Sequence, residues 1–194
     1  MRKVIALASA LGLVASAGYA AAAARVGKKA PAFSLKDENG NKHSLKKYRG
    51  KVVVLEWTNP QCPFVKRHYR AKTMQVTKAA FPGKKVVWLA VNSSHFNKPS
   101  DSASWKREQK LRYHTLQDPS GTVGRAYGAK TTPHMFVIDD KGVLRYNGAI
   151  DDDPYGNNKK KHNYVRGGVS RLLAKKLPKP GLTQPYGCSV KYKR

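Results

Sequence analysis

The sequence predicts an α/β protein with a mixed central sheet flanked by helices and a β-hairpin near the N-terminus. Two continuous apolar runs, residues 52–57 and 85–92, have the composition of buried parallel strands. Stretches with helical periodicity follow these runs, and alternating strands and helices favour helices packed on a sheet. A strand pair then precedes the last helix, which makes the expected sheet mixed, with helices on both faces.

The N-terminal segment, residues 1–24, has the composition of a secretory signal peptide. A basic start at Arg2 and Lys3 precedes an apolar segment, and a run of alanines follows. A membrane anchor is the alternative, but the strongly apolar part is too short to cross a bilayer. We therefore expect the mature chain to be exported and to be periplasmic or secreted. Its two cysteines, Cys62 and Cys188, then meet an oxidising compartment in which a disulfide can form.

The chain is strongly basic, with 38 Lys and Arg against 11 Asp and Glu in 194 residues and a formal net charge of +27. This length suits one domain with a proper hydrophobic core. The cations are spread along the whole chain, and no nucleic-acid-binding motif accompanies them. We interpret the charge as a general surface property that gives weak binding to anionic surfaces, and we expect no specific recognition of nucleic acid.

A short hairpin is expected at the start of the mature chain. Residues 32–35 alternate as a strand, an Asn-Gly turn ends the segment 37–40, and residues 42–45 return as the second strand. Asp37 and Glu38 are a potential ligand pair, but turn chemistry is sufficient to explain them.

Cys62 is expected where the strand of residues 52–57 passes into a helix. Pro63 suits the first helical position, and the apolar residues that follow at helical spacing are Val65, Tyr69, Val76 and Ala80. Unpaired amides and the helix dipole favour a thiolate at this end, and Lys66 adds positive potential. The alternative is a small buried apolar side chain, as many free cysteines are. The strand–turn–helix position favours the reactive thiol.

The second half of the chain continues the alternation. The expected elements are a helix capped by Asp101 or Ser102 and running to about Tyr113, a strand 116–118, a helix 121–127, strands 134–138 and 143–149, and a helix 165–177 ended by Pro178. Three adjacent aspartates, Asp151 to Asp153, raise the possibility of a calcium site. They lack the spacing and the terminal Glu of an EF-hand, so we expect residues 151–163 to be a solvated loop.

Three segments of the chain resemble the redoxins, a thioredoxin-fold group that includes peroxiredoxins of the alkyl hydroperoxide reductase and thiol-specific antioxidant type. These segments are APAFSLKDENGNKHSLKKYRGK, VVVLEWTNPQCPF and GAKTTPHMFVIDDKGVLRYNGAIDD. The resemblance covers roughly residues 28–177 and is strongest to the peroxiredoxin-like branch. It implies a thioredoxin-like fold, a redoxin domain over residues 25–177, a basic tail over residues 178–194, and an enzyme without cofactor or metal.

The resemblance also implies roles for particular residues. Cys62 matches the attacking cysteine, and Pro133 matches a cis proline that faces it, with the backbone of Thr132 presented to an extended substrate. From the sequence alone the Thr132–Pro133 bond is equally compatible with trans, the majority state. The family's threonine three residues before the cysteine is replaced here by Asn59, with Thr58 one residue further back. Either Thr58 takes that role or peroxide activation is weak.

Cys188 has three possible roles. A local Cys-x-x-Cys pair is excluded, because Val65 stands three residues after Cys62. As a resolving thiol, Cys188 condenses with a sulfenic acid formed on Cys62. As a structural partner, Cys188 forms a disulfide with Cys62 that closes a long loop. In the chain-entropy model such a disulfide stabilises the folded state by on the order of 4–5 kcal/mol. The third possibility is a disulfide with another molecule.

We therefore expect an exported thiol-dependent oxidoreductase that uses Cys62 for hydroperoxide reduction or for thiol–disulfide exchange with protein disulfides. Its thiol reductant and its oligomeric state are not indicated by the sequence. The contrasting hypothesis is a non-catalytic binding module for copper or an anionic envelope partner. Cys62, His68 and His134 are suitable copper ligands by type, but the paired cysteines of thioredoxin-fold copper carriers are absent. We expect His68 on the helix surface and His134 beside the proline loop.

Overall fold

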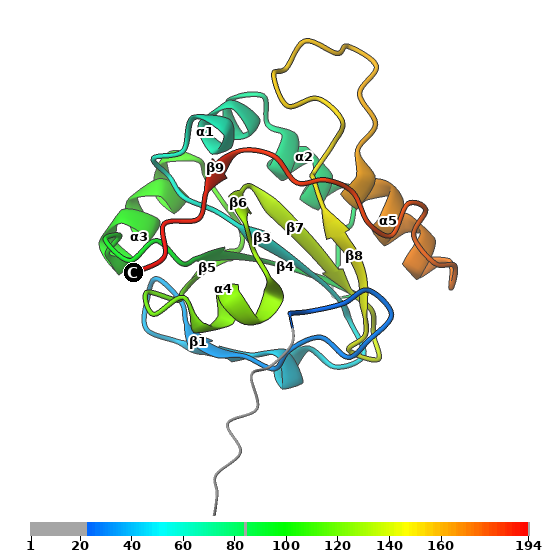
Figure 1. Ribbon diagram of the computed structural model, residues 1–194, viewed down its shortest axis with the longest axis horizontal. Coiled ribbons are helices and arrows are strands. Elements are labelled where there is room, and N and C mark those ends of the chain that lie inside the picture. Colours follow the sequence, from blue (N-terminus) through cyan, green and yellow to red (C-terminus); the bar gives the residue numbers. More distant parts are fainter. Residues whose placement is uncertain (1–22, 84, 194) are drawn as a thin grey trace, which may run out of the picture.

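A seven-stranded mixed sheet forms the centre of the protein in the computed structural model, which describes residues 23–83 and 85–193 (Figure 1). Helices cover both faces of this sheet, so the predicted α/β architecture is confirmed. The predicted signal peptide falls almost wholly on residues 1–22, outside the described residues. Within the described residues, no helix has the length and apolarity needed to cross a bilayer.

The strand order in the sheet is β2-β1-β5-β4-β3-β7-β8, and a separate two-stranded sheet joins β6 to β9. Strands β3, β4 and β5 are parallel, and the remaining neighbours are antiparallel. The bounds are β1 Ser34–Lys36, β2 Lys42–Ser44, β3 Val52–Trp57, β4 Val86–Asn92, β5 His114–Gln117, β6 Thr131–Thr132, β7 His134–Ile138, β8 Leu144–Gly148 and β9 Cys188–Ser189. The predicted hairpin is present, with Leu35 paired to His43.

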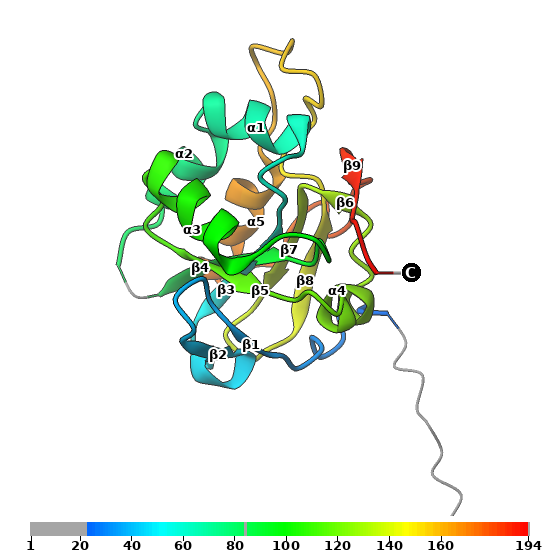
Figure 2. The same ribbon diagram turned by 90° about the vertical axis from the view of Figure 1, so that its left-hand side faces the viewer.

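The helices are α1 Pro63–Arg70, α2 Thr73–Ala79, α3 Pro99–Glu108, α4 Thr122–Tyr127 and α5 Tyr164–Leu173, with a 3-10 turn at Leu45–Tyr48. Helices α1, α3 and α5 lie on one face of the sheet and α4 on the other (Figure 2), and a hydrophobic core lies on each face. Side chains alternate along β3, so Val52 and Val54 join Cys62 in one core, whereas Val53 and Leu55 face the other. The first core packs against α1, α3 and α5, and the second against α4.

The single helix predicted over residues 63–80 is wrong, because α1 and α2 are separate helices. Lys72 between them has a left-handed backbone with φ of 56°, which interrupts the series of helical hydrogen bonds. The break changes the buried face of the second helix. Met74 is therefore buried, whereas Val76, expected in the core, is 56% exposed.

Helix α3 begins and ends earlier than predicted. Pro99 is its first residue, and the carboxylate of Asp101 accepts the Lys98 N–H at 2.8 Å, so Asp101 acts from inside the first turn and is not the cap. Lys110, with φ of 52°, ends the helix in the left-handed region. Lys175, with φ of 58°, ends α5 in the same way, before the proline that we predicted to stop it.

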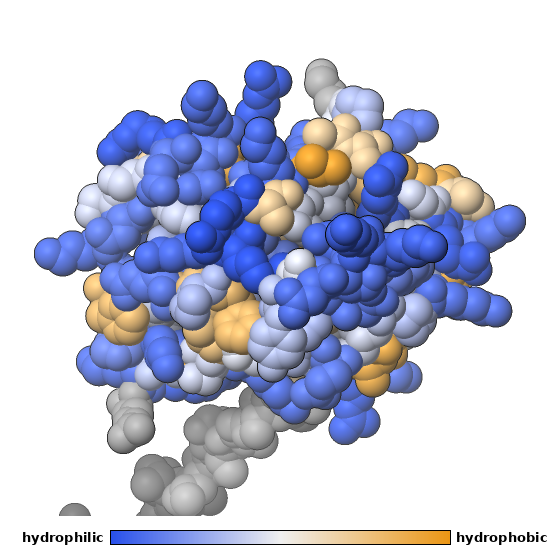
Figure 3. Space-filling model, turned by 90° about the horizontal axis from the view of Figure 1, so that it is seen from above, coloured by the Kyte–Doolittle hydropathy of each residue, from blue (hydrophilic) through white to orange (hydrophobic). Residues whose placement is uncertain are grey.

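The C-terminal segment runs back across the domain from α5, past β6, to α4 (Figure 1). We name residues 183–193 the C-terminal arm. Its first residue, Thr183, bonds the Tyr146 hydroxyl at 2.6 Å. Near its end, the Tyr192 hydroxyl donates to the Ala129 carbonyl at 2.8 Å. The face of the protein seen in Figure 3 is mainly hydrophilic, in keeping with the high charge of the chain.

Candidate active site

Cys62 lies at the junction between β3 and α1, where it is the N-cap of the helix and Pro63 is the first helical residue. The loop before it is shaped by Asn59. The Asn59 side-chain oxygen accepts the Gln61 N–H at 2.9 Å, and its backbone carbonyl accepts the Cys62 N–H at 3.0 Å. This Asx turn holds Cys62 at the helix start, as the sequence predicted.

The Cys62 sulfur faces two groups from distant parts of the chain. Its Sγ lies 3.0 Å from the Thr132 carbonyl oxygen and 2.7 Å from the Cys188 Sγ. The Thr132–Pro133 peptide bond is cis, as the resemblance implied. The Cys62 side chain is buried, with 2% of its surface exposed. The fold thus brings together four of the five candidate residues: Cys62, Cys188, Thr132 and Pro133.

The two thiols have opposite pKa shifts. Burial by itself raises the pKa of Cys62, but hydrogen bonds with the Cys188 and Thr132 side chains and from the Val65 backbone at the helix start outweigh it, so the pKa is lowered. Burial and the neighbouring Cys62 raise the pKa of Cys188 to about 11. The pair therefore loses its first proton from Cys62 while Cys188 keeps its own, and the thiolate is the nucleophilic form.

A short strand pair holds Cys188 in place. Strand β9 runs antiparallel to β6, with Cys188 opposite Thr132, and the Val190 N–H extends the pair by donating to the Lys130 carbonyl at 3.0 Å. Gly187 has φ of +124°, and a Cβ added there would lie 2.2 Å from the Thr132 carbonyl oxygen. Only glycine therefore lets the arm approach this closely.

Thr58, the fifth candidate residue, is buried beside β4. Its backbone N–H donates to the Val91 carbonyl at 2.9 Å. Its hydroxyl has no hydrogen-bond partner within residues 23–83 and 85–193. The side-chain oxygen of Asn59 is occupied by the loop and by the Asn97 amide at 3.3 Å. A role for Thr58 with peroxide stays a prediction.

Within the described chain, the two histidines nearest the site do not form a metal group with Cys62. His68, predicted on the helix surface, is fully buried, and its Nε2 contacts Arg67 and the Tyr186 hydroxyl. Burial, followed by the Arg67 charge, lowers the pKa of His68 to about 3. His134 packs beside the proline loop as expected. Within residues 23–83 and 85–193, the three residues named for copper therefore do not come together as a site.

The predicted solvated loop over residues 151–163 is present and residues 155–160 are exposed, but Asp151 and Asp153 at its start are buried. The Asp151 carboxylate accepts the Tyr186 hydroxyl and, at 3.2 Å, the Asp153 N–H. The Asp153 carboxylate accepts the N–H groups of Gly156 and Asn157, both at 2.8 Å. The loop folds over its own aspartates, so backbone amides replace water as their partners.

One group of side chains in the described residues has metal-ligand types within reach of one another: Asp37, His43 and His114. Asp37 Oδ2 lies 2.9 Å from both His43 Nε2 and His114 Nδ1. The Lys106 ammonium lies 3.5 Å from the same His114 nitrogen and pairs with Glu38. The Lys106 ammonium already supplies a positive charge beside Asp37 and Glu38. Through these contacts the hairpin is bonded to His114 in β5 and to Lys106 in α3. Turn chemistry, which we predicted for the acidic pair, accounts for only part of these contacts.

Glu56 is a buried carboxyl that sequence reasoning missed. It lies in β3 on the same face as Val54 and accepts hydrogen bonds from two residues of the first core, the Tyr69 hydroxyl at 2.7 Å and the Trp88 indole at 2.9 Å. Burial raises the pKa of Glu56 to about 7, although these hydrogen bonds oppose the shift. The signal was present in the sequence, since VVVLEW places one charged residue inside an apolar strand.

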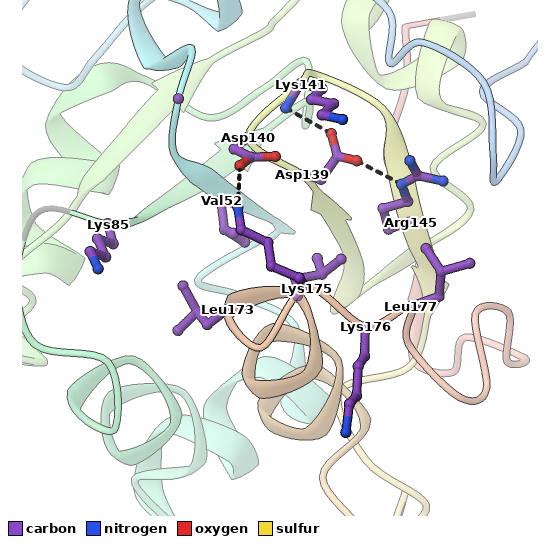
Figure 4. Close-up of a pocket in the computed structure, with 12 residues that line it drawn as sticks. Val52, Lys85, Asp139, Asp140, Lys141, Arg145, Leu173, Lys175, Lys176 and Leu177 are labelled. Atoms are coloured by element: carbon purple, nitrogen blue, oxygen red, sulfur yellow. Dashed lines mark hydrogen bonds and ion pairs between the residues drawn. The ribbon is translucent and has the colours of Figure 1, made fainter.

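A cavity of about 520 Å³ lies away from the sulfurs, between the start of β3 and the end of α5 (Figure 4). In Figure 4, Lys175 reaches Asp140 and Arg145 reaches Asp139, at 2.9 and 2.7 Å. The cavity is lined by Gly50, Val52, Lys85, Asp139, Asp140, Lys141, Arg145, Leu172, Leu173, Lys175, Lys176 and Leu177. None of the candidate redox residues lines it.

The chain is similar in sequence to proteins of one family. The family described as AhpC/TSA matches residues 26–147. A Mycobacterium tuberculosis protein that carries the provisional name peroxiredoxin is 32% identical over 131 residues, which cover 66% of this chain and 78% of that protein. The matched family segment contains Cys62 but not Cys188.

Solved structures share the fold. A hypothetical protein from Sinorhizobium meliloti superposes with a TM-score of 0.76 at 27% identity, over 89% of this chain and 97% of that one. A Chlorobium tepidum protein, provisionally named thiol:disulfide interchange protein DsbE, superposes with a TM-score of 0.57 at 26% identity, over 64% of this chain and 85% of that one. The fold is therefore thioredoxin-like.

Proposed function

Because this chain belongs to the AhpC/TSA family of thiol-based oxidoreductases, we propose that it reduces hydroperoxides with Cys62 and Cys188 as its redox pair. The approach of the two sulfurs to 2.7 Å is the observation that carries the proposal. The lowered pKa of Cys62 and the retained proton on Cys188 support the assignment of roles. Family membership supports the reaction class, and the geometry supports the choice of residues.

The reaction has two steps on the protein. The Cys62 thiolate attacks the O–O bond of the hydroperoxide, so an S–O bond forms, the O–O bond breaks, and the alcohol leaves after taking up a proton. The Cys188 sulfur then attacks the sulfenic sulfur of Cys62. The S–S bond forms while the S–O bond breaks, and the hydroxyl leaves as water with the proton that Cys188 gave up. An external thiol reductant returns the disulfide to two thiols.

The reductant meets the disulfide at Cys188. The Cys188 side chain is half-buried, whereas Cys62 is almost completely covered. A thiolate that attacks Cys188 expels Cys62, whose lower pKa makes it the better leaving group. The greater exposure of Cys188 and the lower pKa of Cys62 thus both favour attack of the reductant on the Cys188 sulfur.

Thiol–disulfide exchange with proteins is a second candidate reaction, supported by the pairing of β9 with β6. A cysteine on an extended strand lies opposite Thr132 and against Cys62 in this pairing. A protein disulfide on a strand of the same shape would meet Cys62 in the same way once the arm has left. Turnover with a hydroperoxide, compared with turnover with a protein disulfide such as insulin, separates the two reactions.

We propose in addition that residues 1–24 direct export. The basic start, the apolar segment and the alanine run of the sequence support this. Expression in a bacterial host should give a mature protein outside the cytoplasm whose N-terminus lies within residues 21–25. Recovery of the uncleaved chain from the cytoplasm alone would contradict export.

Sulfenic-acid trapping with dimedone tests the redox pair. After treatment with hydrogen peroxide, the wild type should form the Cys62–Cys188 disulfide, whereas Cys188→Ser should accumulate the dimedone adduct on Cys62. Cys62→Ser should form neither product and should lose turnover by about a thousandfold or more, as expected for a deleted nucleophile. An unmodified Cys62 in peroxide-treated Cys188→Ser would remove the peroxidase proposal. If Cys188→Ser gave the same oxidised product as the wild type, Cys188 would have no part in the proposed reaction.

A further inference from the structure

Tyr186, two residues before Cys188, places its hydroxyl in a buried polar pocket between α1 and the loop after β8. The hydroxyl bonds the Asp151 carboxylate and lies 3.0 Å from His68 Nε2. Its ring is stacked on the His68 ring, with 5.9 Å between centroids and 25° between planes. The ring of Phe64 flanks it at 6.3 Å. Tyr186 alone therefore connects the arm both to α1, through His68 and Phe64, and to the loop after β8, through Asp151.

The charges of the pocket fix the direction of its hydrogen bonds. Arg67 can only donate, so its Nη2, at 2.8 Å, donates to His68 Nε2, and the neutral imidazole carries its proton on Nδ1. The hydroxyl proton of Tyr186 then goes to Asp151. The other cation facing the pocket is Lys161, which lies 3.7 Å from the Asp153 carboxylate.

The buried carboxylate of Asp151 depends on the arm for one of its hydrogen-bond donors. Asp151 is fully buried, and within the described chain its Oδ2 has no hydrogen-bond partner, so the Tyr186 hydroxyl and the Asp153 N–H at Oδ1 are its main donors. His68 Nδ1 lies 4.0 Å from that Oδ2, beyond hydrogen-bond distance. Withdrawing Tyr186 leaves a buried carboxylate short of a donor, which disfavours undocking of the arm.

Tyr186 is coupled to Cys188 by the shortness of the arm between them. A single residue, Gly187, separates the two, and its close approach to Thr132 fixes the path of the backbone. The strand pair that holds Cys188 directly contains only two residues on each side. A ladder this short is weak alone, so a side-chain anchor next to it has a large influence on where Cys188 lies.

We propose that Tyr186 is a positioning residue whose hydroxyl is held by Asp151 and whose ring is stacked on His68, and that it keeps Cys188 against Cys62 and so sets the rate at which their disulfide closes. The inference rests on the proposed function, because it concerns the second step of that reaction. Tyr186 makes no bond to a reacting atom. Its effect is to raise the fraction of time that the Cys188 sulfur spends within reach of the sulfenic acid.

Tyr186→Phe tests this proposal, because it removes the hydroxyl and keeps the ring. In rapid-quench experiments with hydrogen peroxide, the sulfenic acid on Cys62 should form within about twofold of the wild-type rate. Closure of the disulfide should slow by about 10- to 100-fold, the factor for losing a hydrogen bond to a charged group. In glutathione redox buffers the same variant should shift toward the dithiol by a similar factor.

Two further variants control the experiment. Tyr155→Phe removes a hydroxyl from a tyrosine that also contacts Phe64 but is 74% exposed, and it should close the disulfide at the wild-type rate. Asp151→Asn keeps the shape of the pocket and removes the charge that holds the Tyr186 hydroxyl. It should slow closure in the same direction, and it provides the test if Tyr186→Phe does not fold.

The outcomes distinguish this inference from the function on which it rests. Wild-type closure in both Tyr186→Phe and Asp151→Asn would overturn the positioning role and leave the redox pair intact. An equal loss in sulfenic acid formation and in closure would indicate a merely structural role, and would also overturn it. Absence of sulfenic acid in Cys188→Ser would instead count against the proposed function.

Discussion

The two cysteines reach one another from regions of very different construction. Cys62 follows β3, which is buried at all six of its positions and bonded on both sides to β4 and β7. Cys188 stands on the C-terminal arm, whose regular structure is one two-residue strand. Cys62 is therefore built into the frame of the domain, by which we mean the seven-stranded sheet and the helices packed on it. Cys188 is held by a few contacts that can be released separately. The helix start and the docked arm both lower the pKa of Cys62, and the arm also sets when Cys188 is available.

This difference suits a sulfur pair that must both close and open. Local segments with few buried contacts open at a much lower free-energy cost than the central strands of a sheet. The arm can therefore leave while β3 and α1 stay folded. Variants in the two regions should therefore affect different measurements.

Among variants that keep both cysteines, Gly187→Ala should slow disulfide closure the most, by destabilising the docked arm without affecting the central sheet. A methyl group there would lie 2.2 Å from the Thr132 carbonyl oxygen, at a φ of +124° that disfavours any side chain. We expect the docked arm to be destabilised by about 3 kcal/mol, so that closure of the disulfide slows by about 100-fold. Rapid-quench measurement of closure, together with the midpoint of urea unfolding, checks this.

Gly40→Ala is the matched control for that variant. Gly40 also has a positive φ, of +87°, but no atom lies within 4 Å of the position that its Cβ would take. Gly40→Ala should lower the stability of the β1–β2 hairpin and leave the rate of disulfide closure unchanged. Normal closure in Gly187→Ala, or equal slowing in both variants, would break the distinction between frame and arm.

Glu56→Gln should give a smaller effect, confined to the frame and dependent on pH. Burial raises the pKa of Glu56 to about 7, from an ordinary value of 4.5. The folded protein thus binds this proton more tightly than the unfolded chain does. The stability contributed by the group is fully present below pH 4.5 and is lost as the pH rises through 7, a change of about 3 kcal/mol over the whole window.

Urea unfolding at pH 5 and pH 8 measures this contribution. The wild type should lose about 2–3 kcal/mol more of its unfolding free energy between these pH values than Glu56→Gln does. Glu108→Gln, a change at an exposed carboxylate in α3, is the matched control and should follow the wild type. Parallel stability curves for the wild type and Glu56→Gln would show that Glu56 is not protonated in the folded state.

Much of the frame was predictable, because its signals are local. The apolar runs identified β3 and β4, the Asn-Gly turn identified the β1–β2 hairpin, and Pro63 after the strand placed Cys62 at a helix start. The helix ends were less predictable. Left-handed lysines end three helical segments, and a lysine carries no signal for that conformation, as a glycine would.

The sequence by itself determined the α/β frame and the place of Cys62 within it, because hydrophobic period, turn residues and helix starts act over a few neighbouring positions. Only the tertiary structure decided that Cys188 lies against Cys62 and that Tyr186, His68 and Asp151 share a pocket. The tail over residues 178–194, which includes the arm, is rich in proline, glycine and lysine and has no periodic pattern that predicts docking. Burial of a polar side chain depends on a partner from a distant segment, and the long-range fold alone brings that partner into contact.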